Sequence, residues 1–373
     1  MGVSNQDVSK QRTYLNPMIF KDAIRDSMKS AYLEGNYNLE TFKGFNLFAT
    51  DGSELELPNT PESREGFDVQ ERGLKETDTP KARVSIIRDL QNDFIIDSII
   101  DNFSIGEHQL AYRNIERASE IVDLKKSIVI FDRNYASSEL FLLLLEKESH
   151  FIFRLKSDSY IKERSKMKTN DEWVQISLTS NRKHNIKNEE LKKKAEELGY
   201  LNLRIVNIKL KTGEIETVIT NLPEKIASSQ ELKELYGARW GVEKGYNVMK
   251  NRLDIENFTG KRRICIEQDF YAQTLMFNML VDLKNQCMEE KKENEEDSVE
   301  KCEYDVNMNL LAGKLKINLF KVVFAENEQE RKKYEEDIAY LVSKHLIKNK
   351  NKPSTPRKKT KKKKFPYNNR KNC

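Results

Sequence analysis

The sequence predicts an α/β fold, in which a mixed sheet flanked by helices is interrupted by a β-rich insertion. Three observations carry this prediction. A strand, a helix and a second strand follow one another between 128 and 157, which is typical of α/β proteins. Two β-branched runs at 82–101 indicate a hairpin. The Lys-rich stretch 158–222 contains two further extended runs.

The first 157 residues alternate helical and extended patterns, with turn-forming residues between them. Asn16-Pro17 interrupts the first helical segment, and the serine pair Ser137-Ser138 marks the start of a later helix. The expected elements are a helical segment at 5–34, a strand at 46–58 that meets a glycine turn and continues, a hairpin at 82–101, a helix at 107–124, a strand at 128–131, a helix from 137 and a strand at 150–157.

The rest of the chain changes character twice. Extended runs at 172–178 and 203–223 fall in the charged stretch, and a Thr-Gly pair inside the second run indicates a hairpin. Helical periodicity returns at 228–250 and 267–288, and the acidic stretch 288–303 indicates a solvated connector. The expected parts are an N-terminal helical segment at 1–40, the core at 41–157 and 224–287, the insertion at 158–223, a C-terminal helical region at 288–347 and a disordered basic tail at 348–373.

The composition excludes a membrane-spanning protein. The mean hydropathy is −0.74, and the longest apolar run, Leu140 to Leu145, is far shorter than the ~20 residues that a span needs. The polar start MGVSNQDVSKQR has no apolar segment of a secretory signal. Because 17 Phe and 14 Tyr argue against global disorder, we expect a folded cytoplasmic protein of about two units.

Cysteine and histidine are too scattered for the common metal and disulfide sites. The four cysteines form no Cys-x-x-Cys pair, and the four histidines form no His-Glu-x-x-His motif. Each histidine is therefore interpreted as a surface or packed residue. The glycine motifs of P-loop enzymes and α/β-hydrolases are also missing from the sequence.

The net charge of +5 conceals an uneven distribution. Residues 348–373 contain twelve Lys and Arg and no acid, which leaves 53 basic against 60 acidic residues, about −7, in the rest of the chain. We expect this tail to be disordered because its like charges repel and it has little to bury. It would favour phosphate backbones. The alternative is a solubilising end without a specific partner.

Three acids have positions that suit metal chemistry. Asp51 follows an apolar strand, Asp132 ends the strand 128–131, and Glu243 lies on a helix 111 residues later. Mg²⁺ prefers oxygen ligands, and two such ions about 4 Å apart can activate a water or a 3′-hydroxyl at a phosphodiester. An aspartate at a strand end is more often a cap or turn former, so these three positions alone are weak evidence.

The helix at 236–250 strengthens the hypothesis. Tyr236, Arg239, Glu243 and Lys250 fall on one narrow stripe at about 100° per residue. This stripe suits a phosphate chain: the arginine can grip a phosphate with two hydrogen bonds, the lysine adds charge, the tyrosine stacks or donates, and the glutamate holds metal.

A plainer interpretation of the same helix remains open. Arg239 and Glu243 can form an exposed i,i+4 ion pair worth a few tenths of a kcal/mol. Gly241 and Gly245 each cost about 1 kcal/mol in a helix interior. The segment is therefore not simply a strong helix former.

The same residues carry a family resemblance. The spacing Tyr-x2-Arg-x3-Glu-x6-Lys resembles the Tyr-Arg-Glu-Lys signature of DDE transposases of the insertion-sequence-four type. The resemblance extends over most of residues 5–285, in the family's order. The segments that resemble the family are TDGSELELP around Asp51, VIFDRNYASSELFLLLLEKESHFIFRLKS around Asp132, ITNLP at 219–223 and YGARWGVEKGYNVMKNRLDIENFTGK.

The resemblance implies a ribonuclease-H-like catalytic core. In such enzymes the positions of Asp51, Asp132 and Glu243 form the catalytic triad that binds two Mg²⁺ ions, for which Mn²⁺ can substitute. A metal-held water cuts DNA at the ends of the element, and the released 3′-hydroxyl attacks target DNA. The family's β-rich insertion, between the second aspartate and the glutamate, agrees with the extended runs at 158–222.

The resemblance also implies how DNA is held. Relatives form hairpin ends and flip out a base, and Tyr236, Arg239 and Lys250 match positions that grip the distorted end. Trp173 in the insertion is a candidate stacking platform, although a strand tryptophan is more often packed. The implied partners are double-stranded terminal inverted repeats and target DNA, bound by a homodimer associated with the bacterial nucleoid, with no membrane.

Two departures from the family pattern keep alternatives open. The family normally has a further N-terminal region that helps to recognise terminal repeats, so we expect 1–40 to be a truncated DNA-binding region. The basic tail is not part of the pattern. The alternatives to an active transposase are a catalytically degenerate DNA-binding remnant and a ribonuclease-H-like nuclease without joining activity.

Overall fold

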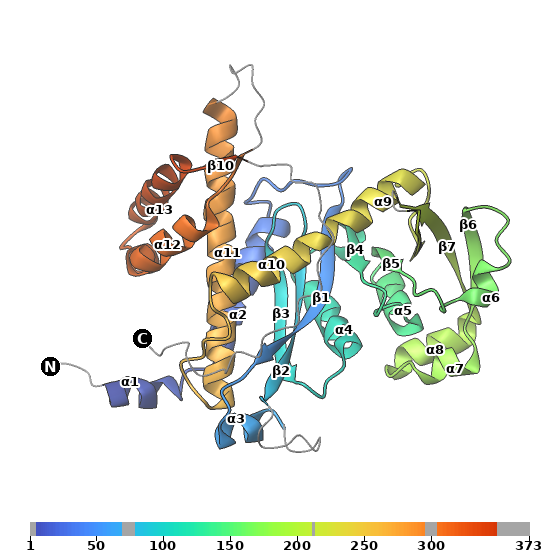
Figure 1. Ribbon diagram of the computed structural model, residues 1–373, viewed down its shortest axis with the longest axis horizontal. Coiled ribbons are helices and arrows are strands. Elements are labelled where there is room, and N and C mark those ends of the chain that lie inside the picture. The colour runs from blue at the N-terminus through green and yellow to red at the C-terminus, as the bar shows by residue number, and fades with distance from the viewer. Residues whose placement is uncertain (1–4, 69–78, 211–212, 295–303, 349–373) are drawn as a thin grey trace.

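A computed structural model of the chain describes residues 5–68, 79–210, 213–294 and 304–348. One eight-stranded sheet runs through the molecule, in the order β3-β2-β1-β4-β5-β8-β7-β6 (Figure 1). The predicted mixed α/β class is confirmed. The strands are β1 (Asn46–Glu56), β2 (Lys81–Asp89), β3 (Ile95–Asn102), β4 (Ser127–Phe131), β5 (His150–Arg154), β6 (Asp171–Ser177), β7 (Tyr200–Lys209) and β8 (Ile215–Thr220).

The centre of the sheet joins parallel and antiparallel pairs. β4 pairs in parallel with both β1 and β5, whereas β1, β2 and β3 form an antiparallel meander. All five residues of β4, SIVIF, are buried, as expected of a central strand covered on both faces. The glycine turn expected after Phe48 was wrong: β1 continues through Gly52, because the antiparallel pairing with β2 extends unbroken past Gly52 to Glu56.

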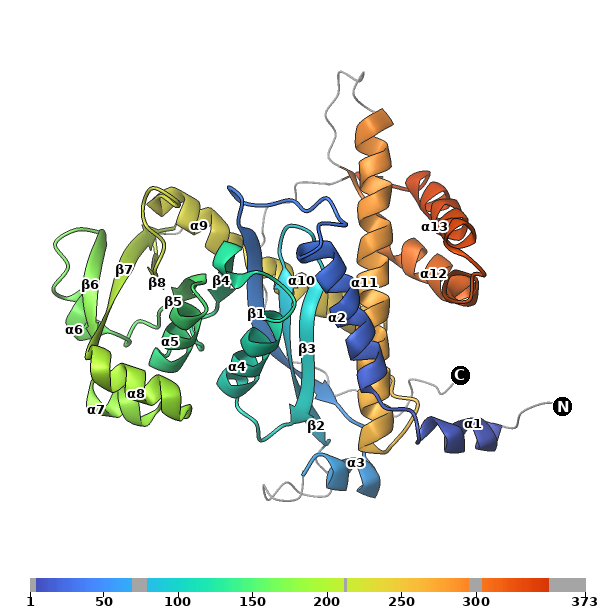
Figure 2. The same cartoon turned by 180° about the vertical axis from the view of Figure 1, so that it is seen from behind.

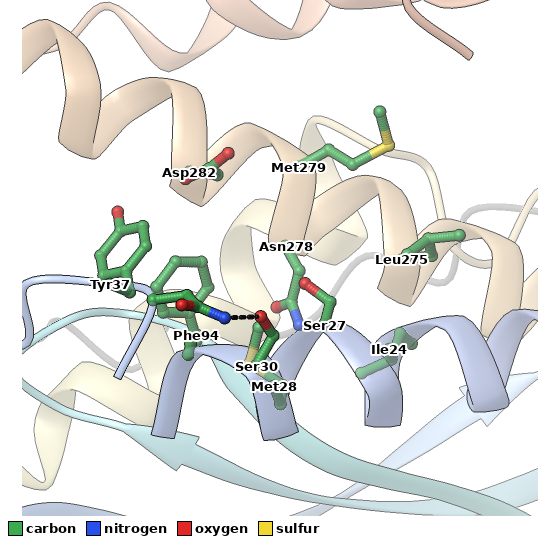
Figure 3. A pocket seen from close by; sticks show the side chains of 12 residues that line it. Ile24, Ser27, Met28, Ser30, Tyr37, Phe94, Leu275, Asn278, Met279 and Asp282 are labelled. Carbon is green, nitrogen blue, oxygen red and sulfur yellow. Dashed lines mark hydrogen bonds between the residues drawn. The ribbon is translucent and has the colours of Figure 1, made fainter. Parts of the chain in front are cut away.

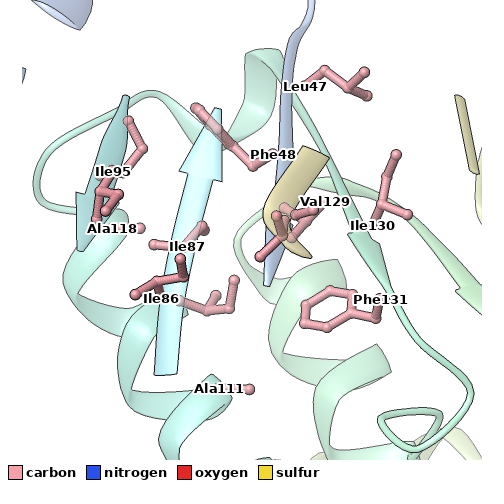
Figure 4. Close-up of a cluster of buried hydrophobic side chains, with 14 of the residues drawn as sticks. Leu47, Phe48, Ile86, Ile87, Ile95, Ala111, Ala118, Val129, Ile130 and Phe131 are labelled. Atoms are coloured by element: carbon pink, nitrogen blue, oxygen red, sulfur yellow. The ribbon is translucent and has the colours of Figure 1, made fainter. Parts of the chain in front are cut away.

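Helices cover both faces of this centre. α10 (Trp240–Asn251) crosses one face in Figure 1, and α4 (Glu107–Ala118) lies on the opposite face in Figure 2. The buried residues of α4 recur with helical spacing, which explains why this segment packs as an amphipathic helix. The apolar core between the strands and α4 is drawn in Figure 4 and includes Phe48, Ile86, Val129 and Phe131, all fully buried.

The strands predicted in 158–223 are present and continue the same sheet. β8 pairs antiparallel with β5, and β7 and β6 follow it outward. Three helices lie in the same stretch and were missed: α6 (Ile161–Arg164), α7 (Ser180–His184) and α8 (Glu189–Leu198). The start of α8 had a readable signal, because Asn188 accepts a hydrogen bond from Leu191 as the N-cap.

The helices expected after the insertion are present with two differences. The single helix expected at 228–250 is divided into α9 (Ser229–Ala238) and α10, with Arg239 between them in a right-handed helical conformation. The connector expected at 288–303 was wrong in its first part, because α11 (Arg263–Asn294) continues through 294. Residues 295–303 lie outside the described ranges.

The terminal helices pack against α11. α2 (Met18–Tyr32) lies between α11 and β3, and the hairpin of α12 (Met308–Val323) and α13 (Glu328–Ser343) lies on the other side of α11 from the sheet (Figures 1 and 2). The remaining elements are α1 (Asn5–Arg12), α3 (Pro61–Gly66), the 3₁₀ turn Leu124–Lys126, β9 (Tyr304–Asp305) and β10 (Ile347–Lys348).

The predicted tail lies outside the described residues, except for Lys348, which belongs to β10. Within the described ranges, no helix has the length and apolar character needed to cross a membrane.

Candidate functional site

Two neighbouring strands place Asp51 and Asp132 side by side. β1 and β4 are parallel, with Thr50 opposite Phe131. The next residues, Asp51 and Asp132, therefore lie at the same end of this strand pair. β4 ends at Phe131, whereas β1 continues beside β2. From Asp51 onward, β1 is therefore paired with β2 on one side and no longer with β4 on the other. The predicted juxtaposition of the two aspartates is therefore present, but the expectation that Asp51 follows its strand was wrong, because Asp51 lies within β1 and only Asp132 follows a strand end.

α10 brings Glu243 over the same edge. The Tyr246 hydroxyl, one turn beyond Glu243, donates a 3.0 Å hydrogen bond to the backbone carbonyl of Asp51. The Glu243 side chain is 35% exposed, so it stands at the rim of the site. The carboxylates of Asp132 and Glu243 are both close enough to Asp51 to act on its pKa.

Arg239 bridges two of the three carboxylates. Its Nη2 lies 3.2 Å from Oε1 of Glu243, and its Nη1 lies 4.0 Å from Oδ2 of Asp51. The Arg239 side chain is 11% exposed, and the central carbon of its guanidinium lies 5.8 Å from the centre of the Tyr236 ring. The break between α9 and α10 falls at this residue.

Tyr236 joins the third carboxylate to the same cluster. Its hydroxyl donates a 3.2 Å hydrogen bond to Oδ1 of Asp132. Burial, with the Asp132 carboxylate adding to it, raises the pKa of Tyr236 to about 12. The phenol therefore stays protonated at neutral pH and remains a donor.

The Asp51 carboxylate is perturbed by its surroundings. Burial raises the pKa of Asp51 to about 6, the negative charges of Asp132 and Glu243 add to the rise, and Arg239 opposes it. Carboxylates held this close share a strong preference for a cation between them. Perturbed groups of this kind gather at functional sites.

The three carboxylates offer only oxygen donors, which suits Mg²⁺. Among the residues that the structure describes, no group of three or more His, Cys, Asp or Glu side chains is arranged so that it could hold a metal ion. The Arg239 guanidinium lies beside the carboxylates of both Asp51 and Glu243. The chemistry of the three donors, all carboxylate oxygens, is that of a site for a hard divalent cation.

The other two predicted residues lie apart from this cluster. Lys250, nearly two turns beyond Glu243, donates a 2.7 Å hydrogen bond to the Glu54 carbonyl and lies 3.6 Å from the Glu256 carboxylate. Trp173 is on β6, the edge strand, with β7, β8, β5 and β4 between it and β1. Its side chain is 42% exposed, so it is not the packed tryptophan that strand position favours.

Sequence reasoning missed three residues that shape the site. Tyr246 holds α10 to Asp51, Arg88 donates to the Gly241 carbonyl, and Tyr135 fills the space beneath β1, where a Cβ on Gly52 would lie 3.1 Å from its hydroxyl. Burial raises the pKa of Tyr135 and of Tyr246 well above the usual value for tyrosine. The only signal in the sequence was the proximity of the two tyrosines to Asp132 and Glu243 along the chain.

A cavity of about 280 Å³ lies between α2 and α11, well away from the carboxylates (Figure 3). Its wall is formed by apolar residues such as Ile24, Phe94 and Leu275, and Asn36 donates a hydrogen bond to Ser30 within it. None of the predicted site residues lines it. The cavity belongs to the junction of the terminal helices.

Comparisons with known proteins relate the chain to transposases. Residues 43–279 match the family described as the transposase DDE domain. The chain is 21% identical over 243 residues to the transposase InsG for insertion sequence element IS4 of Escherichia coli (strain K12), a match that covers 64% of this chain and 52% of that one. The chain thus spans about half the length of this relative.

A solved structure also matches: the cryo-EM structure of a piggyBac transposase synaptic complex with hairpin DNA. The match covers 83% of this chain and 59% of that one, with a TM-score of 0.43 and 9% sequence identity. At that score the likeness is too weak to place a residue.

Proposed function

The chain belongs to the family of the transposase DDE domain, and from this premise we propose that it is the transposase of a bacterial insertion sequence. Its substrates are the double-stranded terminal inverted repeats of the element and a target DNA. It cleaves the element ends in a metal-dependent reaction and joins the 3′ ends to the target. It works as a homodimer on DNA, in the cytoplasm with the nucleoid.

One observation carries the proposal. Asp51 and Asp132 lie at the same end of the parallel strand pair β1–β4. α10 places Glu243 near them, and the charges of Asp132 and Glu243 both raise the pKa of Asp51. Three convergent carboxylates are a costly arrangement, since like charges repel. That repulsion is relieved by divalent cations, which supports the assignment of all three as ligands of two Mg²⁺ or Mn²⁺ ions. Such ions, when bound, activate the attacking oxygen and stabilise the leaving one.

The remaining residues act on the DNA. Arg239 and Tyr236 are bound to the carboxylates themselves in the structure, through Glu243 and Asp132. Both can turn from an internal carboxylate to a DNA phosphate, because each group recognises the same kind of anionic oxygen. Lys250 contributes charge farther along α10, and Trp173 offers an exposed face for a flipped base at the distal edge of the sheet. The ribonuclease-H-like relationship of the core is part of this proposal.

The test is cleavage of DNA that carries the element's inverted repeats. Asp51→Asn, Asp132→Asn and Glu243→Gln are each expected to abolish metal-dependent cleavage while the folded protein still binds the DNA. Glu234→Gln is the matched control, because Glu234 is an exposed carboxylate on α9 whose partner is Gln230. Normal cleavage by any of the three site variants would overturn the assignment.

Two further outcomes separate the alternatives. A wild-type protein that binds the repeats but never nicks them in Mg²⁺ or Mn²⁺ is a degenerate DNA-binding remnant. A protein that nicks but yields no joined product in a strand-transfer assay is a nuclease without joining activity. Both outcomes contradict the proposed function.

A further inference from the structure

α10 approaches the sheet more closely than a side chain would allow. A Cβ added to Gly245 would lie 2.6 Å from Nη1 of Arg88, and a Cβ on Gly241 would lie 3.1 Å from Cδ2 of Leu90. Residues four apart share one face of a helix, so both glycines face β2. Each glycine costs a helix interior about 1 kcal/mol relative to alanine. The close approach explains why this helix contains them.

The space that the two glycines leave is filled by Arg88. This residue of β2 is 5% exposed, and its guanidinium donates to three groups. Nε donates to the Asp93 carbonyl at 2.9 Å, Nη2 donates to the Asp93 carboxylate at 2.6 Å, and Nη1 donates to the Gly241 carbonyl. Its other face lies 5.4 Å from the centre of the Phe277 ring of α11. A buried guanidinium with this many partners holds one orientation.

Arg88 connects the helix of Glu243 to the strand of Asp51. In the β1–β2 ladder Arg88 stands opposite Ala49, two residues before Asp51. Its contacts on α10 are Gly241 and Gly245, which flank Glu243 by two residues on either side. The contacts of Arg88 therefore fix the position and rotation of α10 relative to the β1–β2 pair, which carries Asp51.

We propose that Arg88 is a positioning residue that sets the location of Glu243 relative to Asp51, with Gly245 providing the room for it. The inference rests on the proposed catalytic role of Glu243. Arg88 contacts α10 through the Gly241 carbonyl and acts through that helix. A displacement of about 1 Å between reacting groups can cost ~100-fold in rate, so a fixed spacer at this point matters for cleavage.

The plain alternative is that Arg88 and Asp93 form an internal ion pair that only stabilises the fold, together with Lys284, which lies 2.5 Å from Asp93. A purely stabilising pair would change the melting temperature and leave the folded site unaltered. A positioning residue changes metal affinity and the cleavage step in protein that is fully folded. The two roles are therefore separable by measurements at a temperature well below the melting transition.

The experiment compares Gly245→Ala with Gly237→Ala in the full-length protein. Both substitutions add one methyl group to a helical glycine, but a Cβ on Gly237 meets nothing within 4 Å. Three quantities are measured: Mn²⁺ affinity by titration calorimetry, affinity for inverted-repeat DNA, and the single-turnover cleavage rate. We expect Gly245→Ala to slow cleavage at least ~10-fold and to weaken Mn²⁺ binding, with DNA affinity changed less than ~2-fold. Gly237→Ala should behave as wild type in all three.

A second variant tests the contact itself. Arg88→Lys keeps the positive charge beside Asp93 but lacks the branched head that a Gly245 Cβ would meet. In the Gly245→Ala background it should restore part of the cleavage rate, a non-additive result that a simple loss of stability does not produce. If Gly245→Ala does not fold, Arg88→Lys alone is measured and is expected to weaken Mn²⁺ binding and slow cleavage.

Two results would overturn the inference. One is a folded Gly245→Ala or Arg88→Lys protein with wild-type Mn²⁺ affinity and cleavage rate. The other is a double variant whose defects are simply the sum of the two single ones. The function test is independent: if Glu243→Gln is inactive while Gly245→Ala is normal, only the positioning role is wrong. If Glu243→Gln is active, the proposed function itself is wrong.

Discussion

The Arg239 guanidinium and the Glu243 carboxylate lie 3.2 Å apart, one helical turn from each other, and the same guanidinium lies 4.0 Å from Asp51. A cation held between two carboxylates competes with any other cation for them. We therefore expect Arg239→Met to bind Mn²⁺ more tightly, by roughly fivefold or about 1 kcal/mol. Titration calorimetry in the absence of DNA measures this directly.

The control for Arg239→Met is Lys244→Met, which removes an equal charge from an exposed position on the same helix. It accounts for the long-range part of the effect. Equal or weaker Mn²⁺ binding by Arg239→Met than by Lys244→Met would contradict the competition. Arg239→Met is also expected to bind inverted-repeat DNA less well, because it lacks the guanidinium that would donate hydrogen bonds to a DNA phosphate.

Arg204 is expected to be the most costly arginine to remove. It is 1% exposed, forms two hydrogen bonds to the Asp171 carboxylate at 2.6 and 2.5 Å, and donates to the carbonyls of Leu222 and Ala227. Removing one partner of a buried pair costs about 3–5 kcal/mol. We expect Arg204→Met to lower the free energy of unfolding by that amount in a urea titration. Arg25→Met, which breaks an exposed pair with Asp22, should cost less than about 1 kcal/mol.

Acid should loosen the start of α9. The hydrogen bonds from Lys43 and from Ser228 lower the pKa of Glu231 to about 2, from an ordinary value of 4.5. A depressed carboxyl pKa stabilises the fold above the unfolded value and loses that contribution as pH falls toward the folded one. The stability advantage of the wild type over Glu231→Gln should therefore shrink between pH 4.5 and about 2. Urea titrations across this range, with Glu234→Gln as control, measure it, and a difference that stays constant would contradict the expectation.

The basic tail should contribute to DNA affinity without contributing to cleavage. Deletion of residues 349–373 leaves β10 intact, since that strand ends at Lys348. We expect the slope of log affinity against log salt to fall by about 0.9 for each DNA phosphate that the tail neutralises in the full-length protein. Affinities for random-sequence DNA at several salt concentrations give the slope. An unchanged slope would mean that the tail binds no phosphate.

The positions of the two aspartates could be predicted from sequence because the signal is local. The continuous apolar run before Asp132 indicates a central strand, and Asp132 directly follows the carboxyl end of that strand. The position of Glu243 followed from its spacing to Tyr236, Arg239 and Lys250. Side chains on one helical stripe point in one direction wherever the helix lies, although Lys250 proved too far along α10 to join the carboxylates.

The contacts that complete the site were not predictable, because they join distant segments. Arg88 and the Gly241 carbonyl are 153 residues apart, and the Tyr246 hydroxyl is 195 residues from the Asp51 carbonyl that it reaches. Gly241 and Gly245 were visible as a conflict with helix propensity. The explanation, a buried guanidinium from β2, required the packing of α10 on the sheet.

The packing of α2 on α11 has a consequence for synthesis of the chain. Arg12, just before α2, donates to Gln268 near the start of α11, 256 residues later. During translation Ile24 and Met28 therefore have no α11 to pack against until residues beyond 263 have left the ribosome. Nascent fragments that end before Arg263 should expose α2 to protease. Protection of α2 from protease in such fragments would show that α2 packs against another part of the nascent chain.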